Sequence, residues 1–225
     1  LTIWSYLKES LKPAATAGHS LGEFASLGAS GILSVEDTIK AVCLRGKLMS
    51  QVSNEDHGMA AVLKLDQAAV EEAVEFGASE TGKELRVANY NSPAQYVISG
   101  EKAAIDAAGT VIKEKKGRAI PLPVSGAFHS PLIQDAADEF AAYLGKLDWN
   151  APAFPVYFNA TAETESNPEE DHVFTDDFIR TLDRNRIQPV RCRSAQFPRT
   201  RSQGCADQTV GSQPQGQGIR RKGHR

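Results

Sequence analysis

A serine between two glycines is the stretch of this sequence best suited to chemistry. The spacing is Gly18-x-Ser20-x-Gly22, and a helix-like run starts directly after it at Leu21. A serine hydroxyl becomes nucleophilic when a base takes its proton and a tight turn presents its oxygen. The start of the helix would also direct free backbone N–H groups at a developing oxyanion. The alternative is an ordinary turn. A preceding apolar run and a following helix favour the nucleophile.

A base for this serine has to come from one of five histidines: His19, His57, His129, His172 and His224. His19 adjoins the serine, but neighbouring side chains diverge at such a turn. His172 lies in an acidic loop, and His224 lies in a tail of unusual composition. His129 ends the strand-like segment IPLPVSGAFHSP, and strands of α/β sheets deliver catalytic groups to the loop edge. His129 is therefore the candidate base, although for a lone residue a structurally satisfied histidine at a strand end is the favoured interpretation.

The elements around the serine and the histidine indicate an α/β core. A short strand is predicted at 14–17, a helix from Leu21 to about Ser30, and a second helix opened by the capping box SVED. Further on, the patterns predict a long helix over 131–147, a strand at PVYFNAT and a last helix near 176–182. An apolar stripe is expected on the second helix, formed by Ile39, Val42, Cys43 and Met49.

Residues 57–124 have a pattern of their own. Strand-like segments (MAAVLKL, LRVANY, QYVISG and RAIPLPV) and helix-like segments (QAAVEEAVEFG and EKAAIDAAGTVIKEKKG) follow in the order β-α-β-β-α-β. This order is that of the ferredoxin-like arrangement. We therefore predict a small subdomain inserted into the larger α/β core.

Composition narrows the class of protein. The chain has 225 residues, of which 41% are hydrophobic, which suits one globular unit or a core with an insert. Its three cysteines, Cys43, Cys192 and Cys205, have neither paired spacing nor a metal signature, which favours a reducing, intracellular setting. No apolar run approaches the roughly 20 residues needed to cross a bilayer.

Five separated motifs occur in one order along the chain. They are GHSLGE (18–23), LRGK (44–47), GMAA (58–61), NSP (91–93) and GAFHS (126–130). Together they resemble the malonyl-CoA:acyl carrier protein transacylase family and the related acyltransferase domains of fatty acid and polyketide synthases. The resemblance covers about Pro13 to Arg191, and the agreement of five motifs makes it specific.

The resemblance implies roles for individual residues. Ser20 would be the nucleophile that becomes malonylated, His129 the general base, and the backbone N–H of Leu21 half of an oxyanion hole. Arg45 would pair with the free carboxylate of the malonyl group, which a guanidinium can hold through two hydrogen bonds. Without the resemblance, Arg45 would be interpreted as an arginine that lays its stem along apolar neighbours.

Four more residues are candidates for lining the site: His19, Phe128, Asn91 and Asn159. Phe128, directly before His129, resembles what malonyl-selecting acyltransferase domains have at this position, rather than what methylmalonyl-selecting domains have. Asn91 and Asn159 match positions that the family often keeps, although a turn or a strand-end cap would explain either asparagine equally well. No metal site is predicted, since no cluster of His, Cys and acidic residues is apparent in the sequence.

The resemblance also implies an architecture and a reaction. We expect an α/β-hydrolase-like core from residues 1–56 and 125–191, with the ferredoxin-like subdomain (57–124) inserted. Malonyl-CoA would be the substrate in fatty acid or polyketide synthesis, and the phosphopantetheine thiol of acyl carrier protein would accept the malonyl group. No cofactor is expected. The expected location is the cytoplasm, with neither a membrane nor a nucleic acid as partner.

Two other interpretations stay open. A serine ester or thioester hydrolase shares the Gly-x-Ser-x-Gly turn, but such hydrolases usually place an acid between serine and histidine in chain order. Here those acids fall mostly in the insert, and Arg45 would have no purpose. The second interpretation is an inactive fragment. The family begins with a strand and a Gly-Gln-Gly-Ser-Gln segment that supplies the other oxyanion contact, and we expect that this segment has been lost by truncation.

The C-terminal tail differs from the rest of the chain. Residues 184–225 hold ten Lys and Arg residues but one acid, Asp207, although the whole chain has a net charge of −3. We interpret residues 192–225 as an aberrant, disordered tail read in a shifted frame. If Arg199–Ser202 is encoded CGA ACT CGG TCC, starting one nucleotide later gives Glu-Leu-Gly-Pro, as the family would have; the coding DNA tests this. A basic arm for nucleic acid is less favoured, because Phe197 is its one aromatic residue.

Overall fold

A computed structural model describes residues 1–160 and 162–165 of the chain. These residues belong to one structural unit, Leu1–Arg191. A second unit, Cys192–Arg225, which is the tail predicted to be aberrant, lies outside the described residues, as does the helix expected near 176–182. The described part mixes helices with two sheets, so the predicted α/β class is confirmed.

The first sheet belongs to the core. Its strands are β1 (Thr16–Ala17), β6 (Val156–Tyr157) and β7 (Thr164–Glu165), in the order β1-β6-β7. β1 pairs with β6 in parallel, so segments about 140 residues apart in the chain lie side by side, and β6 pairs with β7 antiparallel. Because β1 and β6 are parallel, their C-terminal ends lie at the same edge of the sheet, and the segments that follow the two strands meet there.

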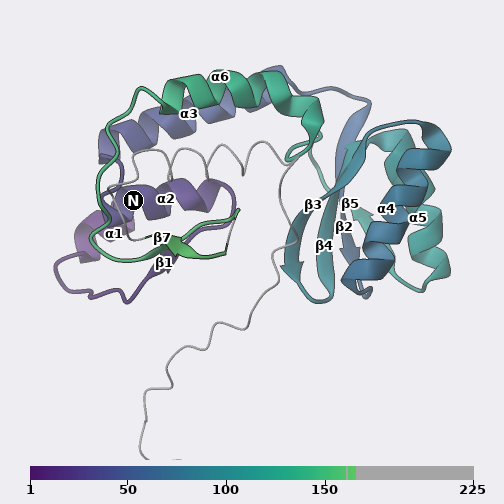
Figure 1. Cartoon of the computed structure of the whole chain (residues 1–225), viewed down its shortest axis with the longest axis horizontal. Coiled ribbons are helices and arrows are strands. Elements are labelled where there is room, and N and C mark those ends of the chain that lie inside the picture. The colour runs from purple at the N-terminus through teal and green to yellow at the C-terminus, as the bar shows by residue number, and fades with distance from the viewer. Residues whose placement is uncertain (161, 166–225) are drawn as a thin grey trace, which may run out of the picture. The chain divides into compact units, whose positions relative to one another are not determined.

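Helices complete the core. They are α1 (Thr2–Leu7), α2 (Leu21–Ser30), α3 (Val35–Gln51) and α6 (Gln134–Leu144), preceded by the 3₁₀ helix η1 (Pro131–Ile133). Of these helices, α2 packs directly against β1 and β6. Figure 1 shows α3 and α6 side by side above α2. The helix predicted over 131–147 is therefore a 3₁₀ turn followed by a shorter α-helix. The turn starts where Ser130 Oγ accepts a hydrogen bond from the Leu132 N–H.

The two helices nearest to the serine begin and end where the sequence predicts. α2 ends at Gly31, which has a φ of +83° in the left-handed region that glycine tolerates best. α3 is capped by Ser34, whose hydroxyl oxygen accepts a hydrogen bond from the Asp37 N–H at 3.0 Å. Both helix ends are therefore determined by residues close to them in the sequence.

The apolar stripe predicted for α3 is partly wrong. Ile39 is 53% exposed and Cys43 is also exposed. The buried residues of this helix are instead Thr38, Ala41 and Leu48. α2 and α6 both pack against α3, and the side chains it buries include the small ones of Thr38 and Ala41.

One hydrophobic cluster holds the core together. Its members come from α2, the connection between α2 and α3, α3, α6 and the segment around β6: Phe24, Leu27, Ile32, Leu33, Ala41, Leu48, Ala136, Phe140, Leu144, Val156 and Phe158. Phe24 and Phe140 bring their rings to a centroid distance of 5.7 Å at an interplanar angle of 54°. This contact fixes α6 over α2, and through it the loop that precedes α6.

The second sheet belongs to the insert. Its elements are β2 (His57–Leu63), α4 (Gln67–Thr81), β3 (Leu85–Ser92), β4 (Gln95–Glu101), α5 (Lys102–Glu114) and β5 (Arg118–Pro121). The strand order is β3-β4-β2-β5 with antiparallel neighbours, and α4 and α5 lie side by side on one face (Figure 1). This is the ferredoxin-like arrangement predicted from the order of elements.

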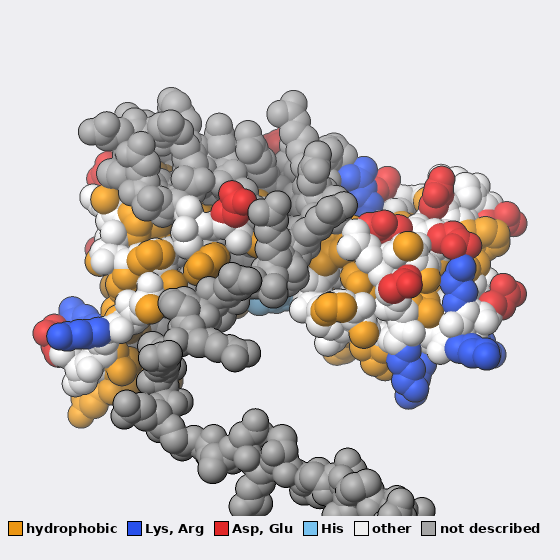
Figure 2. Space-filling model, turned by 60° about the horizontal axis from the view of Figure 1, so that its bottom comes forward, with side chains coloured by type: hydrophobic (Ala, Val, Ile, Leu, Met, Phe, Trp, Pro, Cys, Tyr) orange, Lys and Arg blue, Asp and Glu red, His pale blue; other side chains and the backbone are white. Residues whose placement is uncertain are grey.

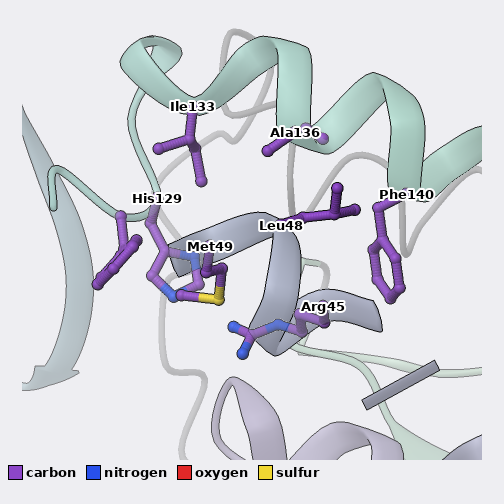
Figure 3. A pocket seen from close by; sticks show the side chains of 9 residues that line it. Arg45, Leu48, Met49, His129, Ile133, Ala136 and Phe140 are labelled. Atoms are coloured by element: carbon purple, nitrogen blue, oxygen red, sulfur yellow. The ribbon is translucent and has the colours of Figure 1, made fainter. Parts of the chain in front are cut away.

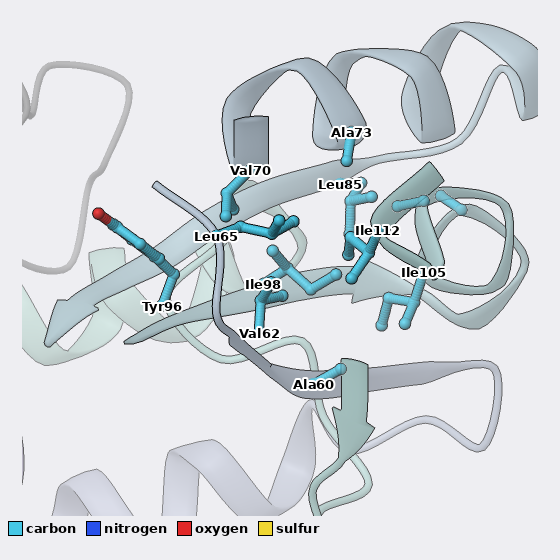
Figure 4. Packing of buried hydrophobic residues seen from close by; sticks show 12 residues of the cluster. Ala60, Val62, Leu65, Val70, Ala73, Leu85, Tyr96, Ile98, Ile105 and Ile112 are labelled. Atoms are coloured by element: carbon cyan, nitrogen blue, oxygen red, sulfur yellow. The ribbon is translucent and has the colours of Figure 1, made fainter. Parts of the chain in front are cut away.

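The insert has a hydrophobic cluster of its own between the helices and the sheet (Figure 4). The labelled members are Ala60, Val62, Leu65, Val70, Ala73, Leu85, Tyr96, Ile98, Ile105 and Ile112. Over the insert, the face in Figure 2 shows acidic and basic side chains interspersed rather than gathered by sign. Of the helices in the described ranges, none has the length and apolar character to cross a membrane.

Candidate active site

Ser20 lies at a strained turn between β1 and α2. Its backbone has a φ of 50° and a ψ of −105°, a conformation costly for any residue with a side chain. Gly18 makes this turn possible, since a Cβ there would overlap the backbone of Gly22 and Glu23. The backbone at the start of α2 comes so close to the Gly18 Cα that a residue with a side chain would not fit there. The geometry is that of the sharp strand-to-helix turn expected from the Gly-x-Ser-x-Gly spacing.

The second glycine of the motif has a different environment. A Cβ on Gly22 would have no atom within 4 Å of it. Gly22 is the second residue of α2, and its N–H donates to the His19 carbonyl at 2.9 Å. The turn therefore needs the first glycine sterically, while the second leaves open space beside the start of the helix.

The structure brings Ser20 and His129 together across 109 positions of sequence. Ser20 Oγ and His129 Nε2 lie 3.1 Å apart, within hydrogen-bonding distance. His129 is 9% exposed and has a φ of 60°, so its backbone is also in the left-handed region. A neutral imidazole with its proton on Nδ1 leaves Nε2 free to accept the hydroxyl proton. The pair has the geometry of a nucleophile and its general base.

Arg45 reaches the same serine from α3. Its Nη2 donates a hydrogen bond to Ser20 Oγ at 3.0 Å. Figure 3 shows Arg45 and His129 extending into one pocket, which is otherwise walled by apolar side chains from α3, η1 and α6: Leu48, Met49, Ile133, Ala136 and Phe140. Burial lowers the pKa of the Arg45 guanidinium, and the negative charge of Glu23 opposes that shift. An arginine in such surroundings stays protonated at neutral pH.

The amides around Ser20 are nearly all engaged. The Ser20 N–H donates to Asn159 Oδ1, and those of Gly22 and Glu23 donate to carbonyls of the turn itself. The N–H of Leu21 has no acceptor within the described residues. Leu21 follows the serine directly and opens α2, and helix starts of this kind present N–H groups to anions; its oxyanion role stays a prediction.

Asn159 and Glu23 support the turn from behind. Asn159 Nδ2 donates to the Gly18 carbonyl at 2.6 Å, and the Asn159 N–H donates to Glu23 Oε1 at 2.9 Å. Glu23 is 1% exposed. Sequence reasoning missed this glutamate, although a carboxylate in the first turn of a helix is a recognisable signal because it complements the helix dipole.

The loop of His129 is held by two serines that sequence reasoning also missed. Ser99 Oγ, on β4 of the insert, donates to the Phe128 carbonyl at 2.6 Å. Ser130 Oγ donates to the Ala127 carbonyl at 2.6 Å. Ser99 is fully buried, and a polar residue between apolar neighbours in a central strand was the signal available. His129 is thus anchored partly to the core and partly to the insert.

Three other candidates from the sequence have different positions. Phe128 lines the pocket of Arg45 and His129. His19 is exposed, and only its backbone carbonyl takes part in the turn. Asn91 is exposed and lies at a register irregularity of β3, and its side chain forms no hydrogen bond within the described part of the chain.

Comparisons with known proteins identify the family of this chain. Residues 6–204 match the family of the acyl transferase domain, a longer range than the resemblance in the sequence. A malonyl CoA-acyl carrier protein transacylase of Escherichia coli K12 is 41% identical over 157 residues, covering 69% of this chain and 50% of that protein. The chain spans about half the length of the curated relatives it matches.

Solved structures give the same result. An acyl carrier protein S-malonyltransferase from Vibrio cholerae superposes with a TM-score of 0.74 at 38% identity, covering 80% of this chain and 58% of that one. A malonyl-transacylase solved in complex with a type II polyketide synthase acyl-carrier protein also gives 0.74, at 35% identity and with the same coverage. The motifs, the fold and the comparisons together show that this chain belongs to the acyl transferase domain family.

Proposed function

We propose that this chain transfers a malonyl group from malonyl-CoA to the phosphopantetheine thiol of an acyl carrier protein. The observation that carries the proposal is that His129 and Arg45, which line one pocket, both reach the hydroxyl of Ser20. A nucleophile with its base performs acyl transfer, and the half-buried cation of Arg45 beside them selects an acyl group that carries a second, negative end. Similarity to malonyl-transacylases over most of this chain supports the same assignment.

The first half-reaction forms an ester. His129 Nε2 takes the hydroxyl proton of Ser20 while Oγ attacks the thioester carbonyl of malonyl-CoA. The carbonyl oxygen becomes an oxyanion, which the Leu21 N–H and the positive end of α2 stabilise. The carbon–sulfur bond then breaks, and the CoA thiolate takes the proton from His129. Malonyl-Ser20 remains.

The second half-reaction repeats these steps with another thiol. His129 takes the proton of the phosphopantetheine thiol, whose sulfur attacks the malonyl ester, and Ser20 leaves with the proton. Arg45 holds the malonyl carboxylate throughout, so that the reactive carbonyl stays next to Ser20. The apolar wall around Arg45 removes competing water and strengthens this ion pair. Phe128 and Asn159 are further residues of the site in this proposal, whereas His19 and Asn91 contribute no side chain to it.

The proposed reaction between malonyl-CoA and the carrier protein uses no bound cofactor. A relative solved with an acyl-carrier protein supports such a protein as the acceptor. We place the reaction in the cytoplasm, and the exposed free thiol of Cys43 supports a reducing compartment.

Intact-protein mass spectrometry after brief mixing with malonyl-CoA tests the proposal. The expected result is one malonyl adduct on the wild-type chain and none on Ser20→Ala. Adding holo acyl carrier protein should then move the malonyl group to its thiol. Release of free malonate without transfer would instead support a thioester hydrolase. A folded chain that forms no adduct would contradict the proposal for this chain and identify it as an inactive fragment.

A further inference from the structure

Ser20 sits in a backbone conformation that the chain would not hold unaided. Its φ of 50° and ψ of −105° fall outside the regions that residues with side chains prefer. The turn hydrogen bonds from Gly22 to His19 and from Glu23 to Ser20 run only within the turn and the start of α2. The position of the hydroxyl relative to His129 therefore depends on contacts from outside this segment.

Asn159 supplies those contacts from the other end of the chain. It directly follows Phe158, which is 2% exposed and belongs to the core cluster, so its backbone is firmly placed. Its side chain accepts from the Ser20 N–H at 3.0 Å and donates to the Gly18 carbonyl at 2.6 Å. One amide side chain thus holds the backbone on both sides of His19, at the Gly18 carbonyl and at the Ser20 N–H.

A buried carboxylate fixes Asn159 in turn. Glu23 Oε1 accepts the Asn159 N–H at 2.9 Å, and Glu23 itself belongs to the first turn of α2. The glutamate therefore closes a ring of contacts from α2 to Asn159 and back to the serine at the start of α2. Such a ring fixes relative positions because no member can shift without breaking a partly buried hydrogen bond.

The same arrangement decides which amide is available for chemistry. Because Asn159 Oδ1 occupies the Ser20 N–H, that donor cannot serve an oxyanion. The neighbouring Leu21 N–H, which has no acceptor within the described residues, is the amide left at the turn. Asn159 thus separates a structural N–H from a catalytic one at adjacent residues.

We infer that Asn159 is a positioning residue for the nucleophile: held by Glu23, it locks the turn so that Ser20 Oγ meets His129 and the Leu21 N–H faces the reacting carbonyl. This inference rests on the proposed role of Ser20 as nucleophile. It assigns Asn159 no contact with the substrate. Binding of malonyl-CoA through Arg45 should therefore be separable from the rate at which Ser20 reacts.

The test uses two reagents that react with the same serine. An alkyl fluorophosphonate requires only an activated serine: the Oγ–P bond forms, the P–F bond breaks, fluoride leaves and the hydroxyl proton passes to His129. Malonyl-CoA additionally requires Arg45. For Asn159→Ala we expect both labelling rates to fall about a hundredfold, the scale of a misplaced reacting group, at an unchanged malonyl-CoA dissociation constant.

Two further variants make the test specific. Asn159→Asp keeps the size of the side chain and an acceptor for the Ser20 N–H, but has no N–H for the Gly18 carbonyl, so we expect a loss of about tenfold. Asn150→Ala removes another asparagine whose Nδ2 donates to a backbone carbonyl of the core, that of Ile32, and which makes no hydrogen bond to Ser20, His129 or Arg45. It should label at the wild-type rate.

Each outcome decides the inference. Wild-type labelling rates in Asn159→Ala would overturn it, as would losses that merely follow the folded fraction seen by circular dichroism. If Asn159→Ala does not fold, Asn159→Asp carries the comparison, and failure of both to fold would assign Asn159 to folding instead. A wild-type chain that reacts with the fluorophosphonate but not with malonyl-CoA would contradict the proposed function and leave the positioning role testable. A wild-type chain inert to both would contradict the two together.

Discussion

Arg45 donates a hydrogen bond to Ser20 Oγ at 3.0 Å, and this contact orients the hydroxyl of the serine. A guanidinium can only donate, so it occupies a lone pair of Oγ. The hydroxyl proton is then directed elsewhere, and His129 Nε2 lies 3.1 Å away to accept it. In the proposed reaction the malonyl carboxylate competes for the same guanidinium, and so the incoming substrate frees the lone pair that attacks.

Replacing Arg45 should change the choice of substrate more than the chemistry. For Arg45→Ala we expect acylation by malonyl-CoA to fall about tenfold to a hundredfold, the value of a charge-assisted hydrogen bond. Acetyl-CoA has no second carboxylate, so its slow acylation rate should not fall in parallel. Arg45→Lys keeps the charge but lacks the planar fork, and should recover part of the malonyl rate. Rapid-quench mass spectrometry measures all three rates; equal losses for both substrates would exclude a carboxylate-binding role.

The two glycines of the motif should respond differently to alanine. Gly18→Ala places a Cβ on the backbone of Gly22 and Glu23, so we expect a loss of stability of about 1–3 kcal/mol or more, with a distorted turn. Gly22→Ala adds a methyl group to open space in a helix and should raise stability by up to about 1 kcal/mol. Urea unfolding of the two variants measures both changes. Similar destabilisation by both would contradict the steric difference.

The hydrogen bond from the insert to the histidine loop should matter for activity. Ser99→Ala removes the donor to the Phe128 carbonyl, and we expect a loss of about 1 kcal/mol in stability together with slower acylation of Ser20. Ser30→Ala is the matched control, because Ser30 is also buried and donates to a backbone carbonyl, that of Leu27, within α2. Both variants should lose stability, but only Ser99→Ala should lose acylation rate beyond its unfolded fraction, as stopped-flow labelling would reveal.

Glu101 should make the insert sensitive to acid. The hydrogen bond from Lys83 is the main cause that lowers the pKa of this carboxyl, with help from the Glu84 N–H. A lowered folded-state pKa stabilises the protein above the unfolded value of about 4.3 and loses that effect as pH falls through the folded value. Glu101→Gln should therefore cost up to about 1 kcal/mol near pH 7 and almost nothing near pH 3. Thermal unfolding across pH 3–7 measures this; a pH-independent difference would refute it.

Local signals carried much of the fold. The β-α-β-β-α-β order of the insert, the start of α2 after Ser20 and the Ser34 cap are set by short-range spacing, so the sequence indicated them correctly. The buried face of α3 is set by its neighbours in space. Periodicity within α3 could not identify it, because α2 and α6 close on Thr38 and Ala41 rather than on the more apolar Ile39.

The site divides in the same way. A motif identified Ser20 and a resemblance identified His129 and Arg45, and the structure brings the three together; their catalytic roles stay predictions. The contacts that support them could not be read from spacing. Asn159 and Glu23 are separated by more than a hundred residues, and their bond exists only because β1 and β6 pair in parallel.

The bond between Ser99 and Phe128 has a mechanical consequence. Ser20 is fixed by contacts of the core, whereas the residue before His129 is tied to a strand of the insert, so the geometry of the reacting pair depends on two separate hydrophobic clusters. The distance between Ser20 Oγ and His129 Nε2 is therefore sensitive to any shift of the insert relative to the core. Under gentle denaturation, activity is expected to disappear while the core and the insert still retain their helices and strands.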